Sequence, residues 1–180
     1  MPNWAFGTVD VTGTEQGVIS FAERFIDYKE SVTAGKRFFA RSFLDEHRTE
    51  LIKSIRAQHD GKPEDEEMTV RFDASFAWSA YSCIIDGYPQ HNPKELITIT
   101  EACIEDAVSV EIRTEEPGMA FEEEILCDPS GELSYDSKDM RAATCRACGN
   151  IQSVGSHADL DEVECCECGE CGFDYTTKEE

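Results

Sequence analysis

The sequence of 180 residues contains no long apolar run. No stretch approaches the roughly 18 consecutive apolar residues that a membrane-spanning helix needs. The first four residues, Met1 to Trp4, also lack the basic segment and the following apolar run of a secretory signal. These absences predict a cytoplasmic protein that does not use a membrane as its partner.

The common catalytic motifs are missing as well. The chain has no phosphate-binding glycine loop, no HExxH pair and no nucleophile elbow. The acidic run Glu122 to Glu124 falls in an expected strand, where neighbouring side chains point to opposite faces, so it does not form a paired acid–base site. We therefore expect a protein that is not an enzyme, with no catalytic residues, no organic cofactor and no small-molecule substrate.

Basic residues are scarce. The chain has 7 Lys and 9 Arg against 24 Glu and 14 Asp, which gives a formal net charge of −22. Simple nucleic-acid binding is recognised by a basic surface, and the chain as a whole does not supply one. A lysine-poor, acidic surface suits a protein that works in concentrated salt, so we expect a halophilic source.

The charge is unevenly distributed. Residues 1–60 have a net charge of −1, whereas residues 61–180 have a net charge of −21. The nearly neutral third indicates either a face that contacts a partner or an incidental composition. It also provides an alternative function, salt-sensitive nucleic-acid binding through the basic segment that contains Lys36, Arg37, Arg41, Arg48, Lys53 and Arg56.

Hydrophobic periodicity predicts an α+β domain. Alternation of apolar and polar residues predicts strands over 4–12, 68–78, 108–112 and 121–127, a further strand that begins at 133, and a short strand within 37–43. The expected order is β-α-(β)-α-β-α-β-β-β. This order predicts a ferredoxin-like sheet with its helices on one face.

Three helices follow from capping signals and apolar spacing. The first begins after Thr14 and buries Val18 and Phe21. The second is expected to begin at a capping box at Ser42 and to end at Gly61, and the third begins at Asn92. In the second helix we expect Leu44, Leu51, Ile52 and Ile55 to be buried and His47, Arg48, Lys53, Arg56 and His59 to be solvated. In the third we expect Leu96, Ile99 and Cys103 to be buried.

Six of the nine cysteines lie between Cys145 and Cys171. In an intracellular chain this density indicates a metal site before it indicates disulfides. The first pair is Cys145-x-x-Cys148-Gly149. The second pair has two registers, Cys168/Cys171 or Cys165/Cys168, and both fit the spacing of a four-cysteine zinc site. We prefer Cys145, Cys148, Cys168 and Cys171 as metal ligands, because residues 172–175 then supply a returning strand.

Two such knuckles resemble a zinc ribbon, and four thiolates give the tetrahedral coordination that a structural Zn²⁺ ion favours. An iron–sulfur cluster is the chemical alternative. The remaining cysteines, Cys83, Cys103 and Cys127, lie in apolar segments and are expected to be buried and inert.

The N-terminal part resembles a known family on three short stretches: Met1-Pro2-Asn3-Trp4, Phe76-Ala77-Trp78-Ser79 and Glu115-Glu116-Pro117-Gly118-Met119-Ala120-Phe121. These are similar to the YubB-like ferredoxin-like proteins of plasmids and phages. The resemblance covers roughly residues 1–135 and implies a ferredoxin-like fold and a mobile-element or viral setting. It implies no activity and no catalytic residues.

Together these observations predict a ferredoxin-like domain over 1–135, a linker over 136–144 and a zinc ribbon over 145–180. The expected function is that of a non-enzymatic interaction protein, in which the ribbon docks on a protein or nucleic-acid partner. The alternatives are a structural or assembly component of a virus particle and the salt-sensitive nucleic-acid binder described above.

Overall fold

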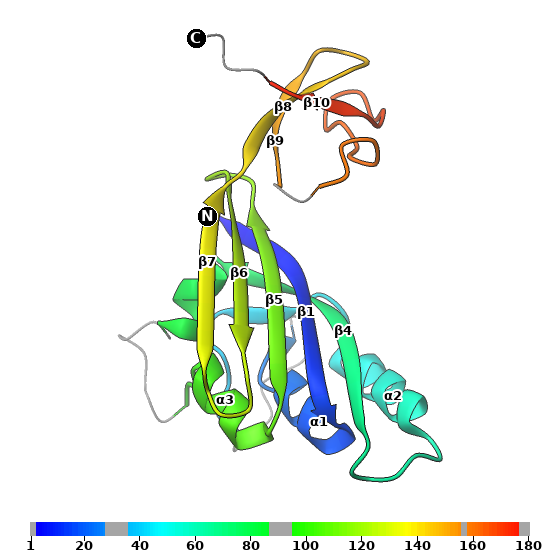
Figure 1. The fold of residues 1–180 in the computed structure, drawn as a ribbon, viewed down its shortest axis with the longest axis vertical. Helices are drawn as coiled ribbons and strands as arrows, with labels where there is room; N and C mark the ends of the chain where they lie inside the picture. Colours follow the sequence, from blue (N-terminus) through cyan, green and yellow to red (C-terminus); the bar gives the residue numbers. More distant parts are fainter. Residues whose placement is uncertain (1–2, 28–35, 87–94, 156–157, 177–180) are drawn as a thin grey trace.

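The computed structural model describes residues 3–27, 36–86, 95–155 and 158–176. These residues form an α+β fold with a large mixed sheet and a small C-terminal sheet (Figure 1). The helices are α1 (Glu15–Ala22), α2 (Arg48–His59), α3 (Ile99–Asp106) and the short π-helix η1 (Tyr81–Ile85). The strands are β1 (Trp4–Thr14), β2 (Ile26–Asp27), β3 (Ser42–Leu44), β4 (Glu67–Ala77), β5 (Ser109–Glu116), β6 (Phe121–Cys127), β7 (Leu133–Asp139), β8 (Arg141–Cys145), β9 (Ile151–Val154) and β10 (Phe173–Tyr175).

The large sheet has seven strands in the order β2-β3-β4-β1-β5-β6-β7. Strand β1 lies at its centre and pairs antiparallel with β4 from Trp4↔Ala77 to Thr14↔Glu67, and with β5 on its other side. Only the β2–β3 pair among the described strands is parallel. The α+β class is confirmed, and the expected order of elements holds except that β2 and η1 are additional.

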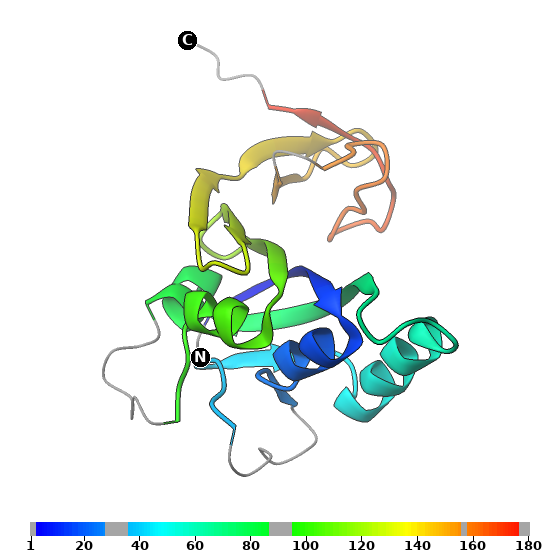
Figure 2. The same ribbon diagram turned by 60° about the horizontal axis from the view of Figure 1, so that its bottom comes forward.

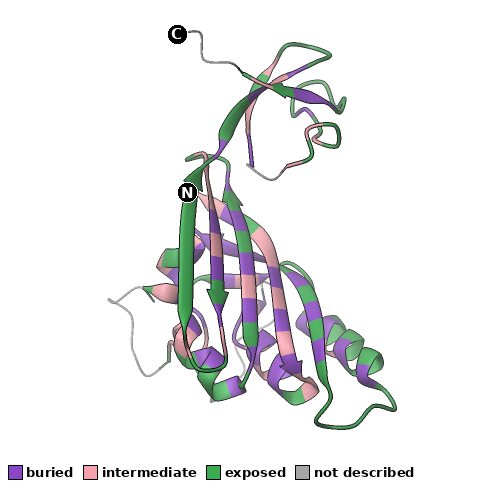
Figure 3. Ribbon diagram, in the orientation of Figure 1, coloured by how far each residue is buried: buried purple, intermediate pink, exposed green. Residues whose placement is uncertain are grey.

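All three α-helices cover one face of this sheet (Figures 1 and 2). Because side chains alternate along a strand, Val9 and Val11 of β1 point toward the helices and are fully buried. A group of phenylalanine rings forms the centre of this core, with centroids 5.0–6.2 Å apart: Phe21, Phe25, Phe39, Phe72 and Phe76. None of the described helices lies over the opposite face of the sheet, and exposed residues alternate with buried ones along β5 and most of β4 (Figure 3).

Capping explains where two of the helices begin. The hydroxyl of Thr14 accepts a hydrogen bond from Gly17 N at 3.2 Å, so the expected start of α1 is confirmed. Helix α3 has a capping box formed by Thr98 and Glu101. The start expected at Asn92 lies outside the described residues. Leu96, which we expected inside that helix, instead forms an isolated bridge with Phe38.

Helix α2 begins five residues later than the sequence predicts. Ser42 is part of β3, where its hydroxyl donates to Ala40 O at 3.1 Å, and the N-cap of α2 is His47. Leu44 is therefore buried from a strand and not from a helix.

Two residues of α2 that we expected in solvent are buried. Arg48 is 6% exposed, and its Nη2 donates to Phe25 O at 3.2 Å. His59 is 5% exposed and lies 3.0 Å from Glu15. Both polar side chains are buried because each has a specific partner, which helical periodicity does not reveal.

The expected linker over 136–144 does not exist as a linker. Strand β7 extends to Asp139, and β8 begins at Arg141, so nearly all of this segment is hydrogen-bonded strand. The polar composition that suggested a linker is explained by an exposed edge strand, since all residues of β7 are exposed. None of the helices that the structure describes has the length and apolar character that a bilayer crossing needs.

An ion pair buried in the core connects the end of α1 to the end of α3. Arg24 Nε lies 2.5 Å from Asp106 Oδ2, and the two side chains are 3% and 4% exposed. We expect Asp106→Asn to lower the free energy of unfolding by about 3 kcal/mol, because it removes the buried counter-charge of Arg24 and leaves only Glu105, which is 45% exposed, beside the guanidinium.

The exposed pair Asp10–Arg71 is the control, since it is also bidentate, at 2.8 and 2.6 Å. Because Arg71 is 64% exposed, Asp10→Asn should cost less than about 1 kcal/mol. Urea unfolding at fixed salt measures both free energies of unfolding. Equal losses of free energy in the two variants would contradict the greater contribution of the buried pair.

Candidate metal centre

Four cysteine sulfurs gather at one point of the C-terminal module. The Sγ atoms of Cys145, Cys148, Cys165 and Cys168 all lie within 4.8 Å of one another. Cys145 Sγ is 3.8 Å from Cys168 Sγ, and Cys148 Sγ is 3.7 Å from Cys165 Sγ. These separations are far longer than a disulfide bond. They match the edge of a tetrahedron with Zn–S distances of about 2.3 Å, so the site is compatible with zinc.

The two knuckles have the same backbone geometry. In each, the amide of the first cysteine donates to the carbonyl five residues later: Cys145 N to Asn150 O at 2.8 Å and Cys165 N to Glu170 O at 2.9 Å. In each, the glycine after the second cysteine donates back to the first cysteine at 2.9 Å, from Gly149 and from Gly169. These glycines have φ values of +75° and +74°, a conformation that favours residues without Cβ.

The fourth position differs from the expected ligand: it is Cys165 and not Cys171. Cys171 forms an isolated bridge with Glu164 just beyond the second knuckle, as Ile151 pairs with Thr144 just beyond the first. It is therefore the first residue of the chain that leaves the knuckle, and it is exposed. Cys145, Cys148 and Cys168 lie in the cluster as expected.

The sequence did not distinguish the two registers, because a glycine follows Cys168 and another follows Cys171. The returning strand that favoured Cys171 does exist as β10, which pairs with β8 from Phe173↔Cys145 to Tyr175↔Ala143. However, β10 forms just as well after the Cys165/Cys168 knuckle, so its presence does not select the ligand. The hydrogen-bond pattern that the two knuckles share selects Cys165.

Backbone amides stabilise the thiolate form of Cys165, which is the form that binds a cation. The amides of Cys168 and Glu167 lower the pKa of Cys165 to about 6. At Cys168 the amide of Glu170 lowers the pKa, but the neighbouring thiols Cys148 and Cys165 outweigh it and raise the pKa to about 12. Four thiolates so close together repel one another, and a bound divalent cation removes that cost.

The hydrophobic core of this module is small. Its buried members are Ala143, Cys145, Val154, Cys165 and Phe173, so two of the five are cluster cysteines. Such a core supplies little free energy of folding by itself, and small modules of this kind use a metal to make up the difference. On the surface, Arg146 bonds Asp174 at 3.0 Å and also pairs with Asp161.

The other cysteines have the environments that the sequence predicts. Cys83, Cys103 and Cys127 are buried, and burial raises the pKa of Cys83 to about 12. A thiol with so high a pKa is a poor nucleophile at neutral pH. Cys166 and Cys171 are exposed and lie outside the cluster.

The acidic run of β6 divides between the two faces of the sheet. Glu123 is 3% exposed and points toward the helices, where it accepts hydrogen bonds from Ala80 N at 2.7 Å, Thr114 Oγ1 at 3.2 Å and Tyr135 Oη at 3.1 Å. These donors make it an anchor for the segment before η1. Sequence reasoning missed this buried acid, and a single acid amid an acidic strand gives no signal of burial.

The basic segment does not gather into one cationic surface. Lys36 pairs with Glu23 at 3.1 Å, Arg37 pairs with Glu101 at 3.0 Å, and Lys53 pairs with Glu50 at 2.7 Å. Arg48 is buried. These pairings neutralise three of the six charges on which the nucleic-acid alternative depends.

Comparisons with known protein families, with curated proteins and with solved structures find no match. The resemblance to the YubB-like proteins therefore stays a prediction. The functional argument rests on the geometry of the cysteine cluster and on the surfaces around it.

The ligand set can be tested by comparing two serine substitutions. Cys165→Ser removes a sulfur from the cluster, so we expect it to lower bound zinc from about one ion per chain to well below one. Cys171→Ser leaves the four sulfurs intact and should retain the ion. Metal analysis by plasma mass spectrometry measures both variants beside the wild type.

Retention of zinc by Cys165→Ser together with its loss from Cys171→Ser would identify Cys171 as the ligand. Iron in place of zinc, with the absorbance of an iron–sulfur cluster, would contradict the choice of metal.

Proposed function

We propose that this chain is a non-enzymatic zinc-binding interaction protein and that its C-terminal module is a zinc ribbon that docks on a partner protein. The observation that carries the proposal is the pair of matching knuckles with sulfurs 3.7–3.8 Å apart. Four thiolates fill the coordination sphere of Zn²⁺ and leave no position for a substrate. The metal then has a structural role, and the function lies in the surface that it holds in shape.

The large domain is a ferredoxin-like core with added elements in this proposal. The strand order β3-β4-β1-β5, with α1 after β1 and α3 between β4 and β5, supports this assignment. It corresponds to the split β-α-β arrangement of that fold, with α2 inserted between two neighbouring strands. The same order supports a relationship to the YubB-like proteins and their plasmid or viral setting.

The charge of the ribbon favours a protein partner over a nucleic acid. Residues 141–176 contain seven acids and two bases. Of these bases, Arg146 is engaged by Asp161 and Asp174, and Arg141 stacks on the ring of Tyr175 at 3.7 Å. A polyanion would meet a negative surface here. The role in assembly of a virus particle stays an untested alternative.

Docking through the ribbon can be tested with full-length variants. Wild type, Cys148→Ser and Cys171→Ser, each tagged, are incubated with host extract at native salt, and the bound proteins are identified by mass spectrometry. We expect the same specific partner with wild type and Cys171→Ser and its loss with Cys148→Ser, because only the last removes a ligand sulfur.

Retention of that partner by a zinc-free Cys148→Ser protein would contradict docking through the ribbon. Nuclease treatment during the incubation separates a direct protein contact from one bridged by nucleic acid.

The halophilic assignment predicts a dependence of stability on salt. A net charge of −22 destabilises the compact chain through self-repulsion. We expect the midpoint of thermal unfolding to rise by roughly 5–10 °C between about 0.5 and 3 M KCl.

Ordinary screening is nearly complete at about 1 M, where the Debye length is about 3 Å. A midpoint that stops rising below that concentration would therefore contradict adaptation to concentrated salt. Circular dichroism at each concentration gives the midpoint.

A further inference from the structure

The face of the large sheet opposite the helices contains two hollows that follow one another along β5 and β6. The first, about 260 Å³, lies at the ribbon end and includes Phe6, Glu115 and Glu122 in its lining. The second, about 600 Å³, lies toward the β6–β7 turn and includes Glu111 and Leu126. We call these two hollows together the trough.

The lining of the trough has an excess of negative charge. Eight acids of the open face line it: Asp10, Glu111, Glu115, Glu122, Glu124, Asp128, Glu132 and Asp136. Three bases line it: Arg71, Arg113 and Lys138. Each base already has an acidic partner on the sheet, in the pairs Arg71–Asp10, Arg113–Glu124 and Lys138–Asp136.

Strand register places the excess charge at the ribbon end. Phe6 of β1 lies opposite Glu115 of β5, which lies opposite Glu122 of β6, which lies opposite Lys138 of β7. Two acids directly opposite each other in a sheet repel. Lys138 faces Glu122, but among the described residues Glu115 has no ion-pair partner. Burial and the charge of Glu122 raise the pKa of Glu115.

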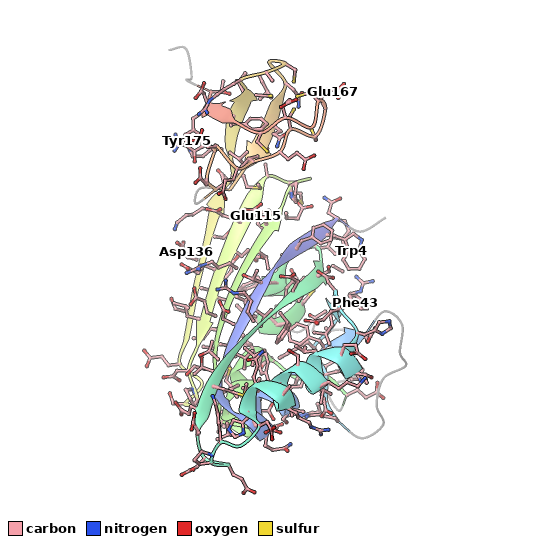
Figure 4. The ribbon with its side chains drawn as sticks, turned by 90° about the vertical axis from the view of Figure 1, so that its right-hand side faces the viewer. Trp4, Phe43, Glu115, Asp136, Glu167 and Tyr175 are labelled. Carbon is pink, nitrogen blue, oxygen red and sulfur yellow. The ribbon has the colours of Figure 1, made fainter. Side chains whose placement is uncertain are left out.

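Phe6 and the ribbon complete this end of the trough. Phe6 is 52% exposed, an unusual state for a phenylalanine in the central strand of a sheet. Gly155 of the ribbon lies so near that a Cβ on it would collide with the Glu115 carboxylate and lie 3.1 Å from Glu122 Oε2. Figure 4 places Glu115 where the sheet meets the ribbon. An aromatic ring beside the Glu115 carboxylate, which has no ion-pair partner among the described residues, is an environment that favours a guanidinium or ammonium group.

We propose that the trough binds a basic, extended segment of a partner protein and that one arginine or lysine side chain of that segment lies between Phe6 and the Glu115–Glu122 pair. Charge complementarity selects this occupant. The eight residues of β5 span about 25 Å, which suits an extended segment of similar length. Leu126, which is 42% exposed, gives that segment an apolar contact at the far end.

This binding site belongs to the large domain and goes beyond docking through the ribbon. Concentrated salt weakens long-range attraction, but charges in contact within a half-enclosed hollow are screened much less than separated surface charges. The site therefore suits a protein that operates in high salt and recognises its partner at short range.

The test uses the full-length protein and a fluorescent ten-residue peptide of alternating arginine and serine as the probe. Anisotropy titrations at about 0.15 and 1 M KCl compare wild type with two variants of equal charge change. Glu115→Gln/Glu122→Gln should weaken binding about tenfold, since it removes both carboxylates at the ribbon end. Glu64→Gln/Glu67→Gln, at two exposed positions just before and at the start of β4, should leave the affinity unchanged.

Equal weakening by both variants would show a general attraction to a negative protein and would overturn the proposal. So would the absence of binding at both salt concentrations, or equal binding of a glutamate–serine peptide. The Glu115→Gln/Glu122→Gln variant keeps all four cluster cysteines, and its zinc content is measured in the same sample. A failure of the trough is therefore distinguishable from a failure of docking through the ribbon.

Discussion

The C-terminal module has few apolar side chains to stabilise it, and its four clustered sulfurs could hold a cation whose binding would supply the missing free energy of folding. Its buried cluster contains Ala143, Val154 and Phe173 besides two of the cysteines themselves, so burial alone supplies little free energy. The thiols of Cys148 and Cys165 raise the pKa of Cys168 and so disfavour its thiolate. A bound cation stabilises the thiolates and lowers that pKa. In the proposed zinc-bound form, the matching knuckles, the small sheet β10-β8-β9 and the surface around them would all depend on that cation.

The two faces of the large sheet have different environments. On one face, alternate residues of β1 and β4 pack against the helices around the phenylalanine group. On the other face, ion pairs such as Asp10–Arg71 cover the backbone, and Phe6 and Leu126 remain exposed. A solvated sheet face normally needs only polar side chains, so these exposed apolar residues among an excess of acids are the observation on which the proposed docking surface rests.

The sequence predicted the parts of the fold that rest on local periodicity. Alternation located β1, β4, β5 and β6, and the Thr14 cap located α1. It did not predict features that depend on distant partners, such as burial of Arg48 beside Phe25 O or of Glu123 beside Ala80 N. The fourth ligand was open for a similar reason. The pattern CxxCG occurs in both registers, and the sulfur positions and knuckle hydrogen bonds of the folded chain separate them.

The continuity of β7 and β8 joins the two surfaces into one. Only Met140 separates these strands, and it is 8% exposed, with its amide donating to Ala120 O at 2.7 Å. A strand that passes from one sheet to the next through a buried residue restricts rotation far more than a polar linker would. Gly155 then lies against the Glu115–Glu122 pair at the end of the trough. A cation bound by the four cysteines would therefore also shape that end, and in the two proposals above the metal, although closed to substrate, would contribute to recognition on the neighbouring sheet.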